Sequence, residues 1–244
     1  MPPLDHVLER ERPGGFGLSC ARCLVGGAAF CSGLQPGDVE RLSAIVTQVR
    51  MPAAATVFEE GEAADFMFSI ASGSVKLYKL LSDGRRQITA FLFPGEFFGL
   101  AVDGGHAYTA EAVTPAVLCR FPRRKLDLLL EHAPRIEKRL LGLAINELAA
   151  AHEQMLLLGR KTAREKVATF LMMLSRRGER RGLPASPVAL PMGRTDIADY
   201  LGLTIETVSR TLTQFKREAV IGLPDAGRAE LLKPDVLRCI AEGG

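Results

Sequence analysis

The spacing of apolar residues changes near residue 122, and this change restricts the chain to a few architectures. Before it, apolar residues alternate along short runs, which is the period of half-buried strands. After it, they recur every three or four positions over long stretches, which is the period of helices. The sequence therefore predicts an α+β fold, with a β-rich part followed by a helical part.

Four short alternating runs in the first part predict strands, at residues 67–70, 73–78, 87–92 and 116–121. Between the second and the third run, Asp83-Gly84 marks a hairpin, because glycine adopts the positive φ that tight turns require. Short strands at this spacing predict a small antiparallel barrel or roll. A helix over residues 36–49 is expected before them, since Val39, Leu42, Ile45 and Val46 follow helical spacing.

A short helical element over residues 122–132 leads to a long helix that begins at Pro134 and runs to about Leu158. Apolar residues along it alternate spacings of three and four, as in a coiled-coil seam. The seam consists of Leu141, Ala144, Leu148, Ala151, Met155 and Leu158. It either pairs with a second copy of the chain or packs on its own domain. The charged residues on the other faces of the helix favour a homodimer.

The next segments predict a helix over residues 162–176, a basic loop and an edge strand at residues 188–190. The loop contains Arg176, Arg177, Arg180 and Arg181. From Arg160 to the end the chain carries fifteen Lys and Arg against ten Asp and Glu, whereas residues 1–159 carry a net charge of −2. A basic last third is typical of a domain that faces a polyanion.

Residues 194–215 predict two short helices joined by a glycine turn. Thr195 and Asp196 suit the start of the first helix, and small Ala198 stands where the two helices would cross. Gly202 supplies the turn and Leu203 anchors it. The second helix opens near Thr204 and is expected to bury Ile205, Val208, Leu212 and Phe215. The spacing of Ala198, Gly202 and Val208 is that of a DNA-binding helix-turn-helix.

The other face of the second helix presents Glu206, Ser209 and Arg210. Arginine can donate two hydrogen bonds to guanine, and glutamate can accept one from cytosine N4. Further DNA contacts are expected from Thr195, Thr207 and Thr213. An ordinary helical hairpin with solvated polar residues is the alternative. Beyond this unit, residues 220–223 and 229–232 predict a hairpin that forms a wing, and residues 234–240 predict a closing helix.

Three of the five cysteines cluster near the N-terminus, with the spacing Cys20-x2-Cys23-x7-Cys31. Cys119 and Cys239 are isolated in the sequence. No apolar run is long enough for a bilayer span and the N-terminus lacks a secretory signal, so a cytoplasmic protein is expected. In a reducing compartment a close cysteine cluster more often binds metal than forms disulfides. A fourth ligand must then come from elsewhere.

These features together resemble the CRP/FNR superfamily of bacterial transcription regulators over essentially the whole chain. Residues 93–99 (FPGEFFG) are similar to a turn of the superfamily's roll, and residues 196–210 are similar to the FNR recognition unit. The resemblance implies an antiparallel β-roll of the cyclic-nucleotide-binding jelly-roll type, a long dimerisation helix and a winged helix-turn-helix. The expected bounds are 1–32 for a cysteine-rich segment, 33–132 for the roll, 133–160 for the helix and 161–244 for the DNA-binding domain.

FNR-type oxygen sensors hold a 4Fe-4S cluster on an N-terminal cysteine cluster and one cysteine late in the roll. Cys20, Cys23 and Cys31 match the first group and Cys119 matches the fourth ligand, although the gap before Cys31 is longer than in the best-known member. Four thiolates suit such a cluster. Structural zinc takes the same ligands and remains the alternative. Cys239 reads as a small buried residue without a ligand role.

Other ligands and activities of the superfamily fit the sequence less well. Cyclic nucleotide binding needs an arginine about ten residues past the Gly95-Glu96 turn, and residues 105–109 contain none. Haem is disfavoured because His106, His132 and His152 are scattered. The chain has no phosphate-binding glycine loop, nucleophile elbow or metal-binding histidine pair, so no enzyme is expected.

The resemblance implies an oxygen-responsive regulator of genes for low-oxygen metabolism, which binds DNA as a dimer while the cluster is present. Its expected partners are a palindrome resembling TTGAT-N4-ATCAA, RNA polymerase and a second copy of the chain. The FNR branch typically places an acidic residue in the dimer helix where this chain has Ala151. The alternative is a redox-blind regulator with structural zinc or another small-molecule effector.

Overall fold

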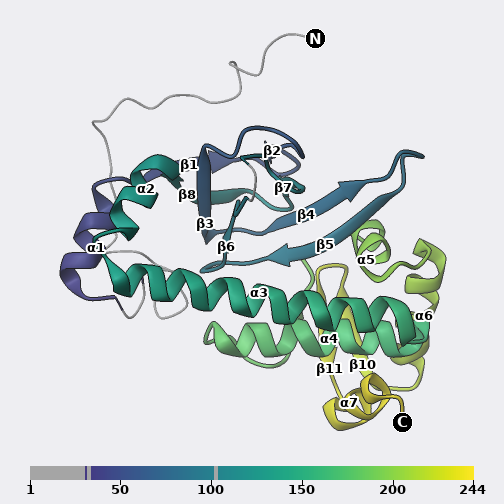
Figure 1. Cartoon of the computed structure of the whole chain (residues 1–244). Coiled ribbons are helices and arrows are strands. Elements are labelled where there is room, and N and C mark those ends of the chain that lie inside the picture. The colour runs from purple at the N-terminus through teal and green to yellow at the C-terminus, as the bar shows by residue number, and fades with distance from the viewer. Residues whose placement is uncertain (1–30, 32–33, 102–103) are drawn as a thin grey trace.

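A β-roll, a long helix and a helical domain with a small sheet follow one another along the chain (Figure 1). The computed structural model describes residues 31, 34–101 and 104–244. This architecture confirms the predicted α+β fold. None of the helices in those ranges is long and apolar enough to span a membrane.

The roll consists of two four-stranded antiparallel sheets, with strand orders β1-β8-β3-β6 and β2-β7-β4-β5. The strands are β1 (Thr47–Met51), β2 (Thr56–Phe58), β3 (Phe66–Ser72), β4 (Val75–Leu80), β5 (Arg86–Leu92), β6 (Phe97–Phe98), β7 (Thr109–Ala112) and β8 (Ala116–Pro122). The sheets pack on a core that includes Phe68, Ile70, Leu77, Phe98 and Leu118. The predicted hairpin between β4 and β5 is confirmed, and Gly84 has a φ of +85° there.

The helix predicted over residues 36–49 extends too far, because α1 (Pro36–Ser43) ends before β1 begins at Thr47. Val49 of β1 lies opposite Leu118 of β8, so backbone pairing in the sheet replaces the helical spacing suggested by Ile45 and Val46. Strands β2, β6 and β7 are also additions to the four predicted runs.

Helices α1 and α2 (Arg123–Leu130) and the first turns of α3 (Pro134–Arg160) cover the outer face of one sheet (Figure 1). The apolar cluster between them is built from buried residues of the helices and of that sheet. Its members are Leu42, Met67, Phe97, Phe121, Leu126, Ala133 and Ile136, and we call it the outer cluster. The long helix therefore begins in contact with the roll.

After α3, the predicted DNA-binding domain begins with α4 (Ala163–Arg180). Thr162 and Glu165 form a capping box at the N-terminus of this helix. The domain continues with β9 (Val188–Ala189), α5 (Arg194–Leu201), α6 (Ile205–Arg217), β10 (Ile221–Asp225), β11 (Arg228–Leu231) and α7 (Pro234–Glu242). The predicted wing is the hairpin β10–β11, and β9 pairs with its β11 strand.

The expected basic loop is wrong, because α4 continues through Arg180. Arg177 on its last turns forms an ion pair with Glu96 of the roll at 2.9 Å and donates a hydrogen bond to the carbonyl of Phe91 at 2.8 Å. Arg181 lies over the ring of Phe93, 4.4 Å from its centroid. The arginines expected in a loop thus contact the roll from the end of α4 and its C-cap.

Gly73, in the turn between β3 and β4, has a φ of +82°, and a Cβ there would lie 2.4 Å from the carbonyl oxygen of Pro115. Gly84 has a similar φ of +85° but open space around it. Gly84→Ala is therefore expected to lower the free energy of unfolding by about 1–2 kcal/mol, the cost of the left-handed backbone. Gly73→Ala should lose about 1–3 kcal/mol more through the clash. Urea unfolding measures both, and equal losses would contradict this account of the turn.

Candidate functional site

The helix-turn-helix is built from α5 and α6, and its turn depends on local residue chemistry. Gly202 ends α5 in the left-handed region with φ +60°, and the backbone N–H of Leu203 donates to the carbonyl of Ala198 at 3.0 Å. Thr204 caps α6, because its hydroxyl oxygen accepts a hydrogen bond from the N–H of Thr207 at 3.2 Å. These contacts fix the angle between the two helices.

Ala198, the small residue expected between the two helices, is buried and only 3% exposed. Val208, Leu212 and Phe215 of α6 are buried as expected. Ile205 is not, since 38% of it is exposed at the first position of α6. Thr211 is buried on this helix together with the three apolar residues.

The exposed face of α6 carries the predicted DNA-reading side chains. Glu206, Arg210 and Thr213 are exposed and Ser209 is half-buried. The pKa of the Glu206 carboxyl is lowered, because it accepts hydrogen bonds from its own backbone N–H and from the hydroxyl of Thr204. Glu206 is therefore ionised and can only accept hydrogen bonds, as contact with a cytosine amino group requires.

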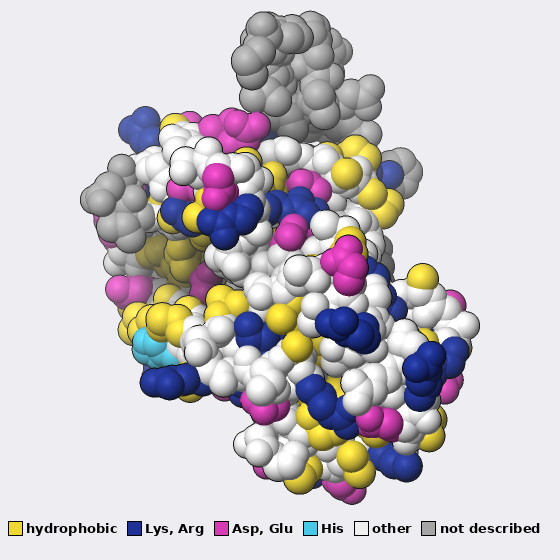
Figure 2. Space-filling model, turned by 90° about the vertical axis from the view of Figure 1, so that its right-hand side faces the viewer, with side chains coloured by type: hydrophobic (Ala, Val, Ile, Leu, Met, Phe, Trp, Pro, Cys, Tyr) yellow, Lys and Arg dark blue, Asp and Glu magenta, His cyan; other side chains and the backbone are white. Residues whose placement is uncertain are grey.

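The other two threonines that are expected to contact DNA also lie in the first turns of α5 and α6. Thr195 is exposed in the first turn of α5 and Thr207 is half-buried in the first turn of α6. Lys216 and Arg217 are exposed in the last turn of α6. Figure 2, which views the molecule from the right-hand side of Figure 1, shows Lys and Arg side chains spread over this face with acidic side chains interspersed among them.

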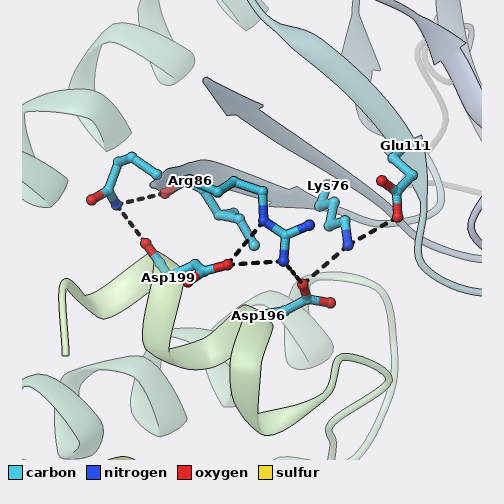
Figure 3. A network of polar contacts seen from close by, with 7 residues as sticks. Lys76, Arg86, Glu111, Asp196 and Asp199 are labelled. Carbon is cyan, nitrogen blue, oxygen red and sulfur yellow. Dashed lines mark hydrogen bonds and ion pairs between the residues drawn. The ribbon is translucent and has the colours of Figure 1, made fainter. Parts of the chain in front are cut away.

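An ionic network that sequence reasoning missed joins α5 to the β4–β5 hairpin of the roll (Figure 3). Nη2 of Arg86 lies 2.7 Å from Oδ1 of Asp196 and 2.8 Å from Oδ2 of Asp199. Nζ of Lys76 lies 3.0 Å from the same Asp196 oxygen and 3.0 Å from Oε1 of Glu111. We call these five residues the hairpin network. They come from segments about 110 residues apart in sequence, so no local pattern could reveal them.

An aromatic contact lies beside the hairpin network. Phe91 of β5 packs on Tyr200 of α5 and on Phe170 of α4, with ring centroids 5.2 and 6.1 Å apart. Tyr200 is buried, and burial raises the pKa of its hydroxyl to about 12. Its backbone carbonyl accepts hydrogen bonds from Gln154 of α3 at 2.8 Å and from Gln87 of β5 at 3.3 Å. The roll, the long helix and the DNA-binding domain therefore meet at Tyr200.

The long helix α3 carries an uncovered apolar stripe in its middle. Leu141, Leu148 and Met155 of the predicted seam are 60%, 58% and 61% exposed. Ala151 is also exposed and Ala144 is half-buried. Leu158 instead packs within its own chain, where its Cδ2 would lie 3.2 Å from a Cβ at Gly202. Exposed Ile145 and Leu156 extend the stripe beyond the predicted residues.

Two of the four predicted ligand cysteines lie within the described residues. Cys31 and Cys119 are both half-buried and both pack against the outer cluster. They are 88 residues apart in sequence, and the fold brings them to the same apolar cluster. Cys20 and Cys23 lie outside the described residues. Cys239 is exposed on α7 rather than buried as expected.

The three histidines weighed against haem binding, His106, His132 and His152, belong to separate segments. His106 is 4% exposed and stacks on Phe58 with ring centroids 3.5 Å apart. Burial lowers the pKa of its imidazole, and the charge of Arg123 adds to this effect. His132 bonds to the carbonyl of Leu128 at the end of α2, and His152 is exposed on α3. Within the described residues no group of three or more His, Cys, Asp and Glu is placed to hold a metal ion.

Known proteins match the chain over nearly its full length. A cyclic nucleotide-binding domain model matches residues 48–133, and a Crp-like helix-turn-helix domain model matches residues 165–240. The chain is 43% identical over 214 residues to the transcriptional activatory protein AadR of Rhodopseudomonas palustris, with 87% of this chain and 90% of that protein covered. The chain belongs to the CRP/FNR family of transcription regulators. It is a DNA-binding regulator and not an enzyme.

Other CRP/FNR members are similar in sequence and structure. The transcriptional activator protein FnrL of Cereibacter sphaeroides is 37% identical over 229 residues, covering 92% of each chain. The structure of FixK2 from Bradyrhizobium japonicum aligns with a TM-score of 0.76 and 39% identity, over 80% of this chain and 97% of that one.

In this CRP/FNR chain Glu96 of the roll accepts a hydrogen bond from the N–H of Phe93 at 2.8 Å, besides its ion pair with Arg177. The Gly-Glu turn thus contacts the DNA-binding domain.

Proposed function

We propose that the protein is an oxygen-responsive activator of transcription, which binds a palindrome resembling TTGAT-N4-ATCAA as a homodimer while it holds a 4Fe-4S cluster. The observation that carries the proposal is the position of Cys31 and Cys119 on one apolar cluster, in a chain whose last domain is a helix-turn-helix. The similarity to FnrL supports the same branch of the family. RNA polymerase is the further partner that an activator requires.

The residues around the two cysteines fit a cluster better than an exposed metal site. Cys119 is on β8, on the opposite face of the sheet from the core residue Leu118. Its half-buried thiol borders the outer cluster, and an apolar shell of this kind restricts water access to a metal centre. With Cys20 and Cys23, the two thiols complete the four thiolates that such a cluster needs. A bound cluster would supply the reactivity towards oxygen.

The same apolar cluster connects the thiols to the dimer helix. Ile136 of α3 is fully buried in the outer cluster, and Leu140 and Leu143 pack against it. A shift of Cys31 or Cys119 on loss of their metal would therefore change the packing of the first turns of α3. The exposed stripe starts at Leu141 on the next turn. Packing at the thiols and pairing of α3 are thus linked through adjacent residues of one helix.

The DNA-reading role of α6 predicts the effect of Arg210→Ala. Loss of its two hydrogen bonds to guanine should cost about 1–3 kcal/mol at that base pair and flatten sequence preference. Fluorescence anisotropy with the TTGAT palindrome and a scrambled duplex measures this. Arg217→Ala, which removes an exposed arginine from the last turn of the same helix, should weaken both duplexes alike by loss of phosphate attraction. Unchanged discrimination by Arg210→Ala would contradict the role of α6.

The thiol site predicts different outcomes for two cysteines. Cys119→Ser should abolish iron binding and activation in cells, because one iron loses its thiolate. Cys239→Ser should leave both intact, since Cys239 is exposed on α7 at the opposite end of the chain. Elemental analysis and the visible spectrum of anaerobically purified protein test this. Equal iron content in Cys119→Ser and in the parent protein would contradict the assignment of Cys119 as a ligand. Zinc in place of iron in the parent protein would indicate the redox-blind alternative.

The α3 stripe predicts that Ala151→Asp shifts the metal-free protein towards monomer. Two carboxylates that face each other across a two-fold axis oppose pairing by up to a few kcal/mol when they are partly desolvated. Without such a pair, the metal-free parent should dimerise more readily than a typical branch member. Sedimentation at micromolar concentration tests both statements. Ala150→Asp is the matched control, because Ala150 is exposed on the side of α3 away from Leu148. A parent protein that is wholly monomeric, and that neither substitution changes, would contradict the prediction that two copies of the chain pair through α3.

A further inference from the structure

The covalent connection between the long helix and the DNA-binding domain does not by itself fix their relative orientation. Helix α3 ends at Arg160 and α4 begins at Ala163, so only Lys161 and Thr162 join them. Both have extended backbones, with ψ angles of 143° and 165°. Such a short non-helical link permits rotation about its backbone dihedrals. The orientation of the DNA-binding domain therefore depends on non-covalent contacts.

The hairpin network supplies a directional part of those contacts, beside the ion pair of Arg177 with Glu96. Asp196 and Asp199 lie on α5, three residues apart, and both face the guanidinium of Arg86. Nε of Arg86 donates to Asp199 at 2.9 Å and its Nη2 donates to Asp196 at 2.7 Å. The planar guanidinium thus holds two carboxylates of one helix at once, which restrains rotation as well as distance.

Lys76 adds a second anchor at the start of the same helix. Its side chain is 7% exposed and lies between Glu111 of the roll and Asp196 of α5. Burial weakens the screening of these charges by water and salt. The hairpin network contains two cations and three carboxylates, so its negative charges already outnumber its positive ones. Removal of Arg86 leaves the two carboxylates of α5 facing each other with Lys76 alone.

From this arrangement we infer that Arg86 and Lys76 are positioning residues that set which spacing between two DNA half-sites the dimer accepts. The inference rests on the proposed function, since it requires a dimer and a two-part site. In a dimer paired through α3, the separation of the two α6 helices depends on how each DNA-binding domain docks on its own roll. The hairpin network holds that docking in one orientation. Specificity for spacing then comes from residues that do not touch DNA.

Spacing is a sensitive measure of orientation. Each added base pair moves a half-site by about 3.4 Å and turns it by about 34° around the duplex. A dimer with rigidly docked domains meets only one spacing without strain. A dimer with loosely docked domains reaches several spacings, but each at a lower effective concentration of the second domain. Loosening therefore reduces the difference between spacings and leaves contact with one half-site intact.

The test measures the affinity of anaerobically purified full-length protein for four duplexes. Three carry TTGAT half-sites in palindromes with spacers of two, four and six base pairs, and the fourth carries one half-site. Arg86→Gln is expected to lower the preference for the four-base-pair spacer by about tenfold, within the range of avidity effects. Its affinity for the single half-site should stay within about twofold of the parent. Circular dichroism verifies that the variant is folded.

Arg85→Gln is the matched control. Arg85 neighbours Arg86 on the same hairpin, but it is exposed and its ion pair is with Asp83 of the hairpin itself, at 2.8 Å. This variant should retain the spacer preference of the parent. The double variant Arg86→Gln/Asp199→Asn tests the pair directly. Because both changes disrupt one contact, its spacer preference should be no weaker than that of Arg86→Gln alone.

The outcomes separate this inference from the proposed function. A parent that prefers four base pairs, with the same preference in Arg86→Gln, overturns the positioning role and leaves the function standing. An equal loss on all four duplexes also overturns it, because the network would then affect only folding or general DNA attraction. A parent that fails to bind any TTGAT duplex above a scrambled one refutes the proposed recognition site, and this inference with it.

Discussion

The docking of the DNA-binding domain on the β4–β5 hairpin is the contact on which the arrangement of the whole molecule depends. Tyr200 of α5 receives the ring of Phe91 from the roll, and its carbonyl accepts hydrogen bonds from Gln87 and Gln154. One residue of the helix-turn-helix is thereby tied to the roll and to the long helix. A displacement of the roll or of α3 would therefore act directly on α5, the helix that packs against α6.

Apolar and ionic contacts have different roles at this junction. Burial of a large side chain such as Phe91 or Phe170 contributes about 1.5–3 kcal/mol, and such burial is nearly independent of direction. Buried ion pairs often repay little more than the desolvation of their charges, yet their geometry is specific. The aromatic cluster therefore holds the domains together, and the ions of Arg86 and Lys76 select one orientation among those that the cluster would permit.

The success of the sequence analysis follows from the range over which each signal acts. The helix-turn-helix was predictable because Gly202, Thr204 and the buried face of α6 act within a few residues of one another. The strand at Val49 was not, because its pairing with Leu118 depends on residues about 70 positions away. Arg86 and Asp199 carry no local signal of their contact. Local rules likewise placed Ile205 in the core, although the position of α6 relative to its neighbours decides its exposure.

The two ends of α3 make different contacts, and this difference gives the helix a mechanical role. Its 27 residues span about 40 Å. Ile136 at one end packs in the outer cluster, against which Cys31 and Cys119 also pack, and Leu157 at the other end is buried in the apolar cluster that contains the core of the DNA-binding domain. The exposed stripe lies between these ends. In the proposed dimer, pairing of two such helices would restrain both ends at once, so a change in packing at the cysteines would reach the pairing surface through one helix, while the docking of each DNA-binding domain on its roll would set the separation of the DNA-reading helices.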